Sequence, residues 1–162
     1  GWAALTEWVS TNRVFIMEHK ETKSQSTFSQ EEFDKLNKLS HEVLAAAITV
    51  HKELGAGLLE SVYQECLKAE LRSMGYKVET EVEFPLIYKG IETEKIFRVD
   101  MIVEDAFLVE LKAVEEIKPI HEVQLVTYMK LLGIHMGFLL NFNVQYLKDG
   151  VRRKINGYVR GK

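Results

Sequence analysis

The chain has 162 residues, 46% hydrophobic and 28% charged, which fits one ordinary globular domain. Its net charge of -3 and pI of about 6.0 exclude a uniformly basic protein, so nucleic-acid binding would need a local patch of positive charge. The single cysteine, Cys66, excludes an internal disulfide, and no apolar run approaches the ~18 residues of a membrane span, so we expect a cytoplasmic protein with no membrane partner.

Residues 1–36 are expected to form an N-terminal extension. Residues 1–16 precede the first methionine, Met17, and are interpreted as either a tag remnant or a piece of upstream reading frame. Residues 18–31 are polar and have no clear period, so the extension should be poorly ordered unless it docks. The folded domain is expected to occupy residues 37–162.

Two helices are predicted next. The first covers 39–55, with Ser40 as its N-cap and Gly55 as its stop. The second covers 58–74 and should end at Gly75. Three strands follow at 76–90, 91–103 and 107–114, and Pro85 favours an edge position or a bend for the first.

The last part of the chain predicts a helix over 118–133, ended by Gly133, and a short strand over 136–142. Asp149-Gly150 is typical of a hairpin turn, so residues 146–147 should pair with 151–155. The order α-α-β-β-β-α-β indicates an α/β fold with a mixed sheet flanked by helices and a C-terminal hairpin.

Charged residues interrupt two of the apolar strands. Side chains alternate between strand faces, so Val99, Met101 and Val103 should share an apolar face. Glu110 and Lys112 should lie with Leu108 on the mixed face of the third strand. A three-residue loop at 104–106 would place Asp100 opposite Glu110. We expect this loop length, because a one-residue slip in the pairing would bury a carboxylate among valines.

Two facing carboxylates repel each other, and something must relieve the repulsion. A bound Mg²⁺ or Mn²⁺ would do so, because these cations prefer oxygen ligands. The alternative, about equally favoured by the spacing, is that Asp100 pairs with Arg98 or Lys112 at a solvated edge and that nothing binds there.

Three motifs occur in a fixed order along the predicted elements. Asp100 and Glu110-Leu111-Lys112 resemble the D…(D/E)xK core of the PD-(D/E)XK nuclease superfamily. Gly57, Glu60 and Tyr63 have the spacing that names the GxxExxY family, a bacterial and archaeal branch of that superfamily. Gln124 and Tyr128 resemble the QxxxY motif of several branches. The resemblance covers about residues 38–157, with Val99 in place of the proline that often precedes the aspartate.

The resemblance implies a restriction-endonuclease-like αβββαβ core that binds a divalent cation. Asp100, Glu110 and the backbone carbonyl of Leu111 would be metal ligands, and Glu60 would reach the metal or its water shell. Lys112 would position or activate the attacking water, or stabilise negative charge on the phosphoryl group. Gln124 would touch the scissile phosphate or hold Lys112.

Several of these residues have an equally simple structural role. Tyr63 could orient Glu60, but a partly buried core tyrosine is as good an interpretation. Tyr128 shares a helix face with Gln124 and would support the site. The basic residues Arg152, Arg153 and Lys154 fit either a solvated hairpin face or a contact with a phosphate backbone.

The sequence therefore supports two hypotheses about function. The first is a metal-dependent nuclease that cleaves DNA or RNA. The second is a non-catalytic module that keeps the fold and binds nucleic acid or protein. A protein partner or a homo-oligomer is compatible with both.

Overall fold

A computed structural model describes residues 27–161, and the expectations for residues 1–26 lie outside this range. In chain order the elements are β1 (Thr27–Phe28), α2 (Gln30–Leu54), α3 (Glu60–Ser73), β2 (Val78–Tyr88), β3 (Ile91–Val103), β4 (Phe107–Lys112), α4 (Pro119–Leu132), β5 (Met136–Asn141), the 3-10 turn η2 (Leu147–Gly150), β6 (Val151–Ile155) and β7 (Tyr158–Val159). The predicted order of helices and core strands is confirmed. None of the described helices is both long and apolar enough to span a membrane.

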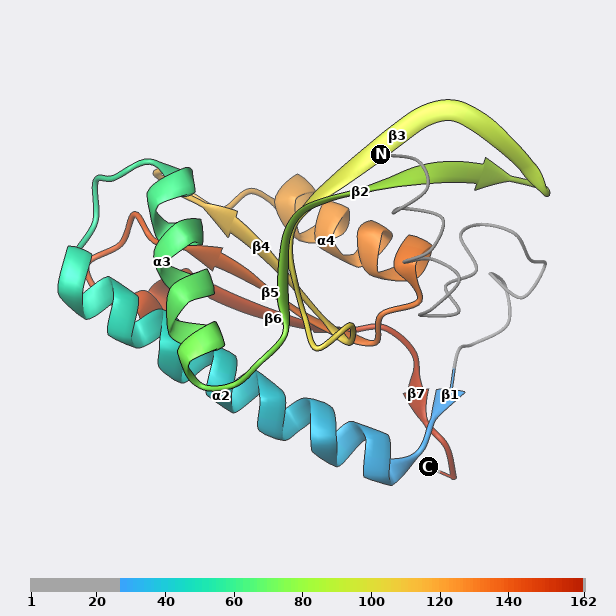
Figure 1. The fold of residues 1–162 in the computed structure, drawn as a ribbon, viewed down its shortest axis with the longest axis horizontal. Helices are drawn as coiled ribbons and strands as arrows, with labels where there is room; N and C mark the ends of the chain where they lie inside the picture. Colours follow the sequence, from blue (N-terminus) through green and yellow to red (C-terminus); the bar gives the residue numbers. More distant parts are fainter. Residues whose placement is uncertain (1–26, 162) are drawn as a thin grey trace.

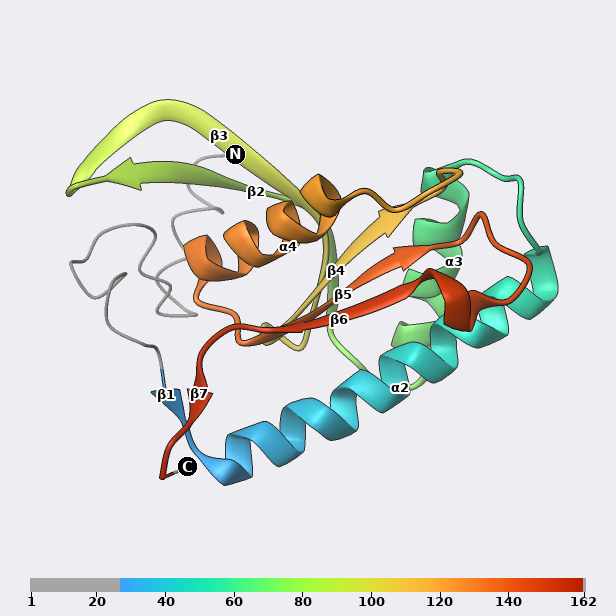
Figure 2. The ribbon, with the colours of Figure 1, turned by 180° about the vertical axis from the view of Figure 1, so that it is seen from behind.

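The main sheet has five strands in the order β2-β3-β4-β5-β6. Within this sheet only β4 and β5 pair in parallel, and α4 makes the crossover between them. Strands β1 and β7 form a separate two-stranded parallel sheet. Helices α2 and α3 cover one face of the sheet, and α4 covers the other (Figures 1 and 2). The fold is therefore the mixed α/β architecture that the sequence predicts, with Pro85 on edge strand β2.

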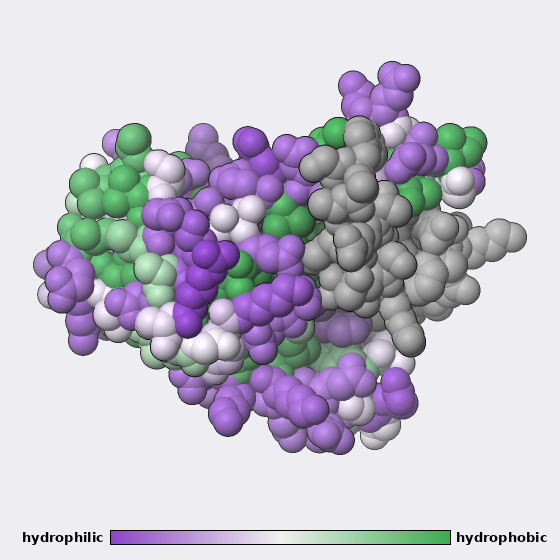
Figure 3. Space-filling model, in the orientation of Figure 1, coloured by the Kyte–Doolittle hydropathy of each residue, from purple (hydrophilic) through white to green (hydrophobic). Residues whose placement is uncertain are grey.

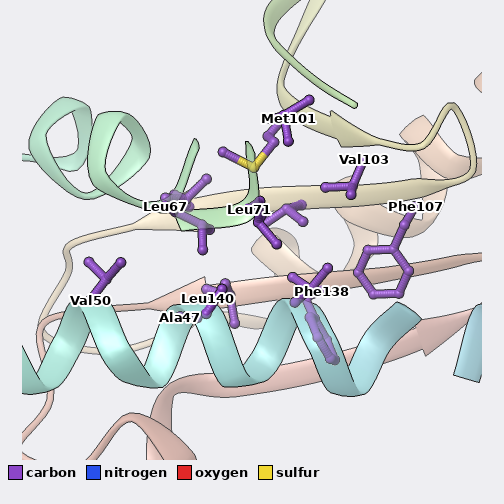
Figure 4. Packing of buried hydrophobic residues seen from close by; sticks show 14 of the residues in the cluster. Ala47, Val50, Leu67, Leu71, Met101, Val103, Phe107, Phe138 and Leu140 are labelled. Carbon is purple, nitrogen blue, oxygen red and sulfur yellow. The ribbon is translucent and has the colours of Figure 1, made fainter. Parts of the chain in front are cut away.

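Each face of the sheet has its own hydrophobic core. The core under α2 and α3 includes Met101, Phe107 and Phe138 from the sheet, and Figure 4 shows them facing Ala47, Val50, Leu67 and Leu71 of the helices. The core under α4 includes Val99, Ile102, Leu108 and Leu139. Because β4 alternates between the two cores, its Leu108 face, which carries Glu110 and Lys112, is turned toward α4.

The first long helix begins at Gln30, nine residues before the predicted start at residue 39, so the predicted start and the predicted N-cap, Ser40, are both wrong. Ser29 is the N-cap: its hydroxyl accepts a hydrogen bond from the Glu32 backbone N–H at 3.0 Å. Phe28 packs on Phe33 across this cap, with ring centroids 6.2 Å apart. Ser40 is instead a fully buried residue of the helix interior. The described fold therefore begins before residue 37.

The predicted pairing of residues 146–147 with 151–155 is also wrong. Leu147–Gly150 forms a 3-10 turn, and β6 pairs antiparallel with β5 at the edge of the main sheet. Gly150 packs against the carbonyl oxygen of Asn141, a site that a Cβ would fill. The glycine is thus required by close packing rather than by a two-residue hairpin.

Strands β2 and β3 change faces together at one position. Val78 and Met101 lie in the core under α2 and α3, whereas Val82 and Val99 lie in the core under α4. The expectation that Val99 shares a face with Met101 is therefore wrong. The change falls at Glu81, whose φ is +52°, where the pairing skips from Thr80↔Met101 to Val82↔Val99. Beyond it the two strands continue as an arm outside the rest of the sheet (Figure 1).

Candidate active site

The pairing of β3 with β4 ends where the carboxylates begin. The register Val103↔Phe107 and Met101↔Val109 confirms the predicted three-residue loop at 104–106. Next to Met101, hydrogen bonds from the backbone to the two carboxylates replace the ladder between β3 and β4. The Asp100 N–H donates to Glu110 Oε1 at 3.2 Å, and the Leu111 N–H donates to Asp100 Oδ2 at 2.8 Å. Asp100 and Glu110 therefore face each other, each as an acceptor for the opposite strand.

Glu110 is an acid held where a negative charge is costly. Its side chain is 9% exposed, and burial raises its pKa well above the usual range. The negative charge of Asp100 and a hydrogen bond between the two carboxyl groups raise this pKa further. The nearby Lys112 ammonium lowers it, but with a smaller effect. Burial and the Asp100 carboxylate therefore outweigh Lys112 in their effect on the pKa of Glu110.

Lys112 follows on the same face of β4 and is half-buried, opposite Asn141 of β5. Within residues 27–161 the Lys112 ammonium forms no ion pair or hydrogen bond. Arg98, the other cation considered for Asp100, pairs instead with Glu81, at 3.0 Å. The solvated ion pair considered above for Asp100 is therefore absent from this part of the chain.

Helix α4 brings a tyrosine to the carboxylates. Burial raises the pKa of Tyr128, and the negative charges of Glu110 and Asp100 raise it further, so its phenol lies near both acids. The Gln124 amide donates to the Tyr128 hydroxyl at 3.1 Å and opposes this rise. The structure therefore brings both residues of the QxxxY motif to the side of the sheet that carries Glu110.

Glu60 reaches the site from the first turn of α3. Its carboxylate accepts a hydrogen bond from the Ala113 N–H at 3.3 Å, one residue beyond Lys112. Glu60 and Asp100 share an open groove of about 490 Å³. Its remaining lining comes from the start of α3, from β2 and from the end of β4: Leu58, Leu59, Ser61, Gln64, Glu81 and Ala113.

Tyr63 holds the turn before α3 in place and does not orient the Glu60 side chain. It is completely buried, stacks on Phe142 with ring centroids 4.5 Å apart, and donates its hydroxyl hydrogen to the Gly55 carbonyl at 2.6 Å. The same hydroxyl oxygen accepts the Leu58 N–H at 3.1 Å. Gly57, between these two residues, has a φ of +98°, which favours glycine. The spacing Gly57, Glu60, Tyr63 thus describes a clamped turn that presents a carboxylate.

Glu81 is a groove residue that the sequence did not suggest. Its carboxylate accepts from Gln64 of α3 at 3.1 Å and pairs with Arg98 at 3.0 Å. Glu81 sits in a run that alternates like an ordinary strand, so no residue type marks its positive φ. Glu81 and Asp100, which lie at the change of strand faces, both line the groove beside α3.

The basic side chains of β6 contact residues other than Asp100, Glu110 and Glu60. Lys154 pairs with Glu122 of α4 at 2.8 Å, and Arg153 donates to Asn37 of α2 at 2.8 Å. Arg152 donates to the Val151 carbonyl at 3.0 Å. Among the described residues, no three His, Cys, Asp or Glu side chains form a group that could hold a metal ion. Asp100 and Glu110 are therefore a pair, with Glu60 nearby in the groove.

Comparison with protein families adds an independent finding. A family model described as the PD-(D/E)XK nuclease superfamily matches residues 37–154, which is more than half of the chain. The matched range contains α3, all of α2 except its first seven residues, the main sheet except the last residue of β6, and every residue of the site above. No curated protein and no solved structure matches the chain.

Proposed function

The chain belongs to the PD-(D/E)XK nuclease superfamily, and from that premise we propose that it hydrolyses phosphodiester bonds of nucleic acid with a divalent cation, Mg²⁺ or Mn²⁺. The observation that carries the proposal is the facing pair of Asp100 and Glu110, in which burial and mutual repulsion raise the pKa of Glu110. A cation between the two carboxylates would remove both costs. We further assign the chain to the GxxExxY branch, because Gly57, Glu60 and Tyr63 build one turn whose Glu60 lines a groove together with Asp100.

The donor set suits Mg²⁺ or Mn²⁺. Mg²⁺ commonly takes one or two carboxylates and completes its shell with water and substrate phosphate. Asp100 and Glu110 supply two carboxylates, the Leu111 carbonyl would supply a further oxygen, and Glu60 would act on the water shell from the groove. The bound cation would neutralise charge on a phosphoryl oxygen and lower the pKa of a coordinated water.

Lys112 is the residue to which we assign the chemical step. Attack by water forms a new phosphorus–oxygen bond and breaks the bond to the leaving sugar oxygen. The water gives up one proton to solvent, and the leaving oxygen takes one up. As an ammonium group without an ion pair among residues 27–161, Lys112 would hold the water and the phosphoryl oxygens together as negative charge grows on them.

Tyr128 and Gln124 would act as positioning residues. Gln124 holds the Tyr128 hydroxyl, which is affected by the charges of both carboxylates and would donate to a phosphate oxygen or to a ligand water. No base-reading motif accompanies these groups, so the proposal extends to the phosphodiester and not to a sequence.

A cleavage assay with purified protein tests the proposal. Single- and double-stranded DNA and RNA are incubated with Mg²⁺, Mn²⁺ or EDTA, using the wild type, Lys112→Ala, Asp100→Asn and the surface control Lys95→Ala. Cation-dependent cleavage by the wild type and Lys95→Ala, lost in the other two variants, supports a nuclease. Cleavage that persists in Lys112→Ala would remove the assigned role of Lys112. Binding without cleavage under every condition would favour the non-catalytic module.

A further inference from the structure

The groove beside the carboxylates has an apolar wall that the proposed chemistry leaves unexplained. Leu58 and Leu59 line it and are 40% and 75% exposed. Figure 3 shows hydrophobic surface gathered over the connection between α2 and α3, where these residues lie. Single exposed leucines are common on proteins, but two on one wall of a groove that also holds Asp100 and Glu60 form an amphipathic site.

Leu59 also occupies a position where a leucine is unfavourable for the fold. It is the N-cap of α3, and its side chain makes no capping hydrogen bond. Serine, threonine, aspartate or asparagine would satisfy an orphan N–H of the first turn there. A residue that weakens its own helix and remains exposed indicates a use outside the fold.

The turn that carries the two leucines is held firmly in place. The buried Tyr63 hydroxyl bridges the Gly55 carbonyl and the Leu58 N–H, as described above. A rigid apolar edge loses little conformational freedom when a ligand packs on it. The backbone that carries the leucines is therefore held next to Glu60, the first residue of α3.

A nucleotide has the same two-part character as the groove. Its phosphate suits a cation held by carboxylates, and its base offers a flat apolar face. A base inside a duplex is stacked on both sides and cannot turn such a face to a leucine, whereas an unpaired or frayed base can. Apolar side chains, leucine among them, are known to separate stacked bases as wedges.

We infer that Leu58 and Leu59 form a wedge that packs on an unstacked base next to the scissile phosphate, so that the substrate is single-stranded or forked nucleic acid. This inference rests on the proposed function, because the cation held partly by Asp100, which lines the groove, would bring the phosphate there. Leu59, the more exposed of the two, makes the larger contact. Fully paired duplex would bind through its backbone alone.

Binding and cleavage are measured separately to test it. Short oligodeoxynucleotides carrying a fluorescent adenine analogue are prepared as single strands, forks and blunt duplexes. Affinity is measured by anisotropy in Ca²⁺ with wild type, Leu59→Ser and Ile91→Ser. Ile91 is a matched control, because it is 67% exposed at the tip of the β2–β3 arm. Cleavage of the same probes is then followed in Mn²⁺.

The expected result is a loss of affinity in Leu59→Ser of roughly tenfold for single strands and forks, with the duplex and Ile91→Ser unchanged. Leu59→Trp should instead tighten single-strand binding and quench the analogue. Serine is a better N-cap than leucine, so Leu59→Ser should melt no lower than the wild type, and misfolding cannot imitate the loss.

Two results would overturn the inference: equal losses on duplex and single strand, or no loss in Leu59→Ser. The latter would leave the surface to a different partner. If the wild type cleaves no probe in Mn²⁺, the proposed nuclease activity fails by itself, while the anisotropy data still decide whether Leu59 contacts unpaired bases.

Discussion

Replacing Glu110 with glutamine should stabilise the protein in EDTA, by an amount that grows with pH. The glutamine can keep the acceptor for the Asp100 N–H and adds an amide donor toward the Asp100 carboxylate. Burial and the Asp100 charge raise the pKa of Glu110 in the folded chain, whereas the unfolded chain has the ordinary value. Below the pKa of the unfolded chain, Glu110 is protonated in both the folded and the unfolded state and does not lower the free energy of unfolding. As pH rises toward the folded pKa, stability is lost, and the substitution should recover it.

The size of the effect follows from the pairing. The carboxyl groups of Asp100 and Glu110 lie within hydrogen-bonding reach, and two full charges about 4 Å apart repel by about 4 kcal/mol at an effective dielectric constant of ~20. Uptake of a shared proton limits the loss, so we expect roughly 1–3 kcal/mol near pH 8. For a chain of this length each kcal/mol corresponds to about 2–4 °C in Tm.

Thermal denaturation of wild type, Glu110→Gln and the exposed control Glu94→Gln between about pH 4 and pH 8 in EDTA measures this difference. The wild-type and Glu110→Gln curves should coincide at the acid end and separate toward the basic end. Added Mn²⁺ should raise the Tm of the wild type but not of Glu110→Gln. If the Tm difference between Glu110→Gln and the wild type is constant with pH, or equal to that of Glu94→Gln, then Asp100 and Glu110 do not repel each other as described.

Three further predictions concern the site and its support. Lys112→Ala should abolish cleavage and keep the Mn²⁺-induced rise in Tm, because Lys112 is assigned to the chemical step and not to metal binding; loss of that rise would contradict the assignment. Tyr63→Phe should cost about 1–3 kcal/mol in denaturant unfolding, since the Gly55 carbonyl and Leu58 N–H lose their buried partner, and an unchanged midpoint would mean that water replaces the hydroxyl. Ser29→Ala should lower the unfolding free energy by about 1 kcal/mol, whereas Ser29→Asp should not, if Ser29 caps α2.

The parts of the fold that were predictable follow from short-range rules. Strand alternation and one loop length fixed the register of β3 and β4, because a slip would have buried charge. Gly55, Gly75 and Gly133 end their helices as expected, each with a positive φ. The missed start of α2 was also local, since Ser29 and Glu32 form an S-x-x-E box within a polar run that we had assigned to the extension.

The parts that were not predictable depend on contacts between distant residues. Asp149-Gly150 looks like a hairpin turn, but Gly150 is selected by its contact with Asn141, which no local pattern reveals. Leu59 reads as an ordinary helix residue until the structure shows it exposed on a groove wall. Tyr63 could not be assigned to either of its two roles before its hydrogen bonds to Gly55 and Leu58 were known.

The position of the carboxylates also explains how the chain tolerates them before any cation binds. Each of Asp100 and Glu110 accepts a backbone N–H of the opposite strand where the ladder has ended, so two donors that would otherwise lack partners are satisfied. Replacement of both acids by valine would remove the repulsion but leave those two N–H groups unsatisfied, at about 1–3 kcal/mol each. The acids therefore hold the two strand ends together, and the repulsion between them remains as free energy that the proposed cation would recover on binding.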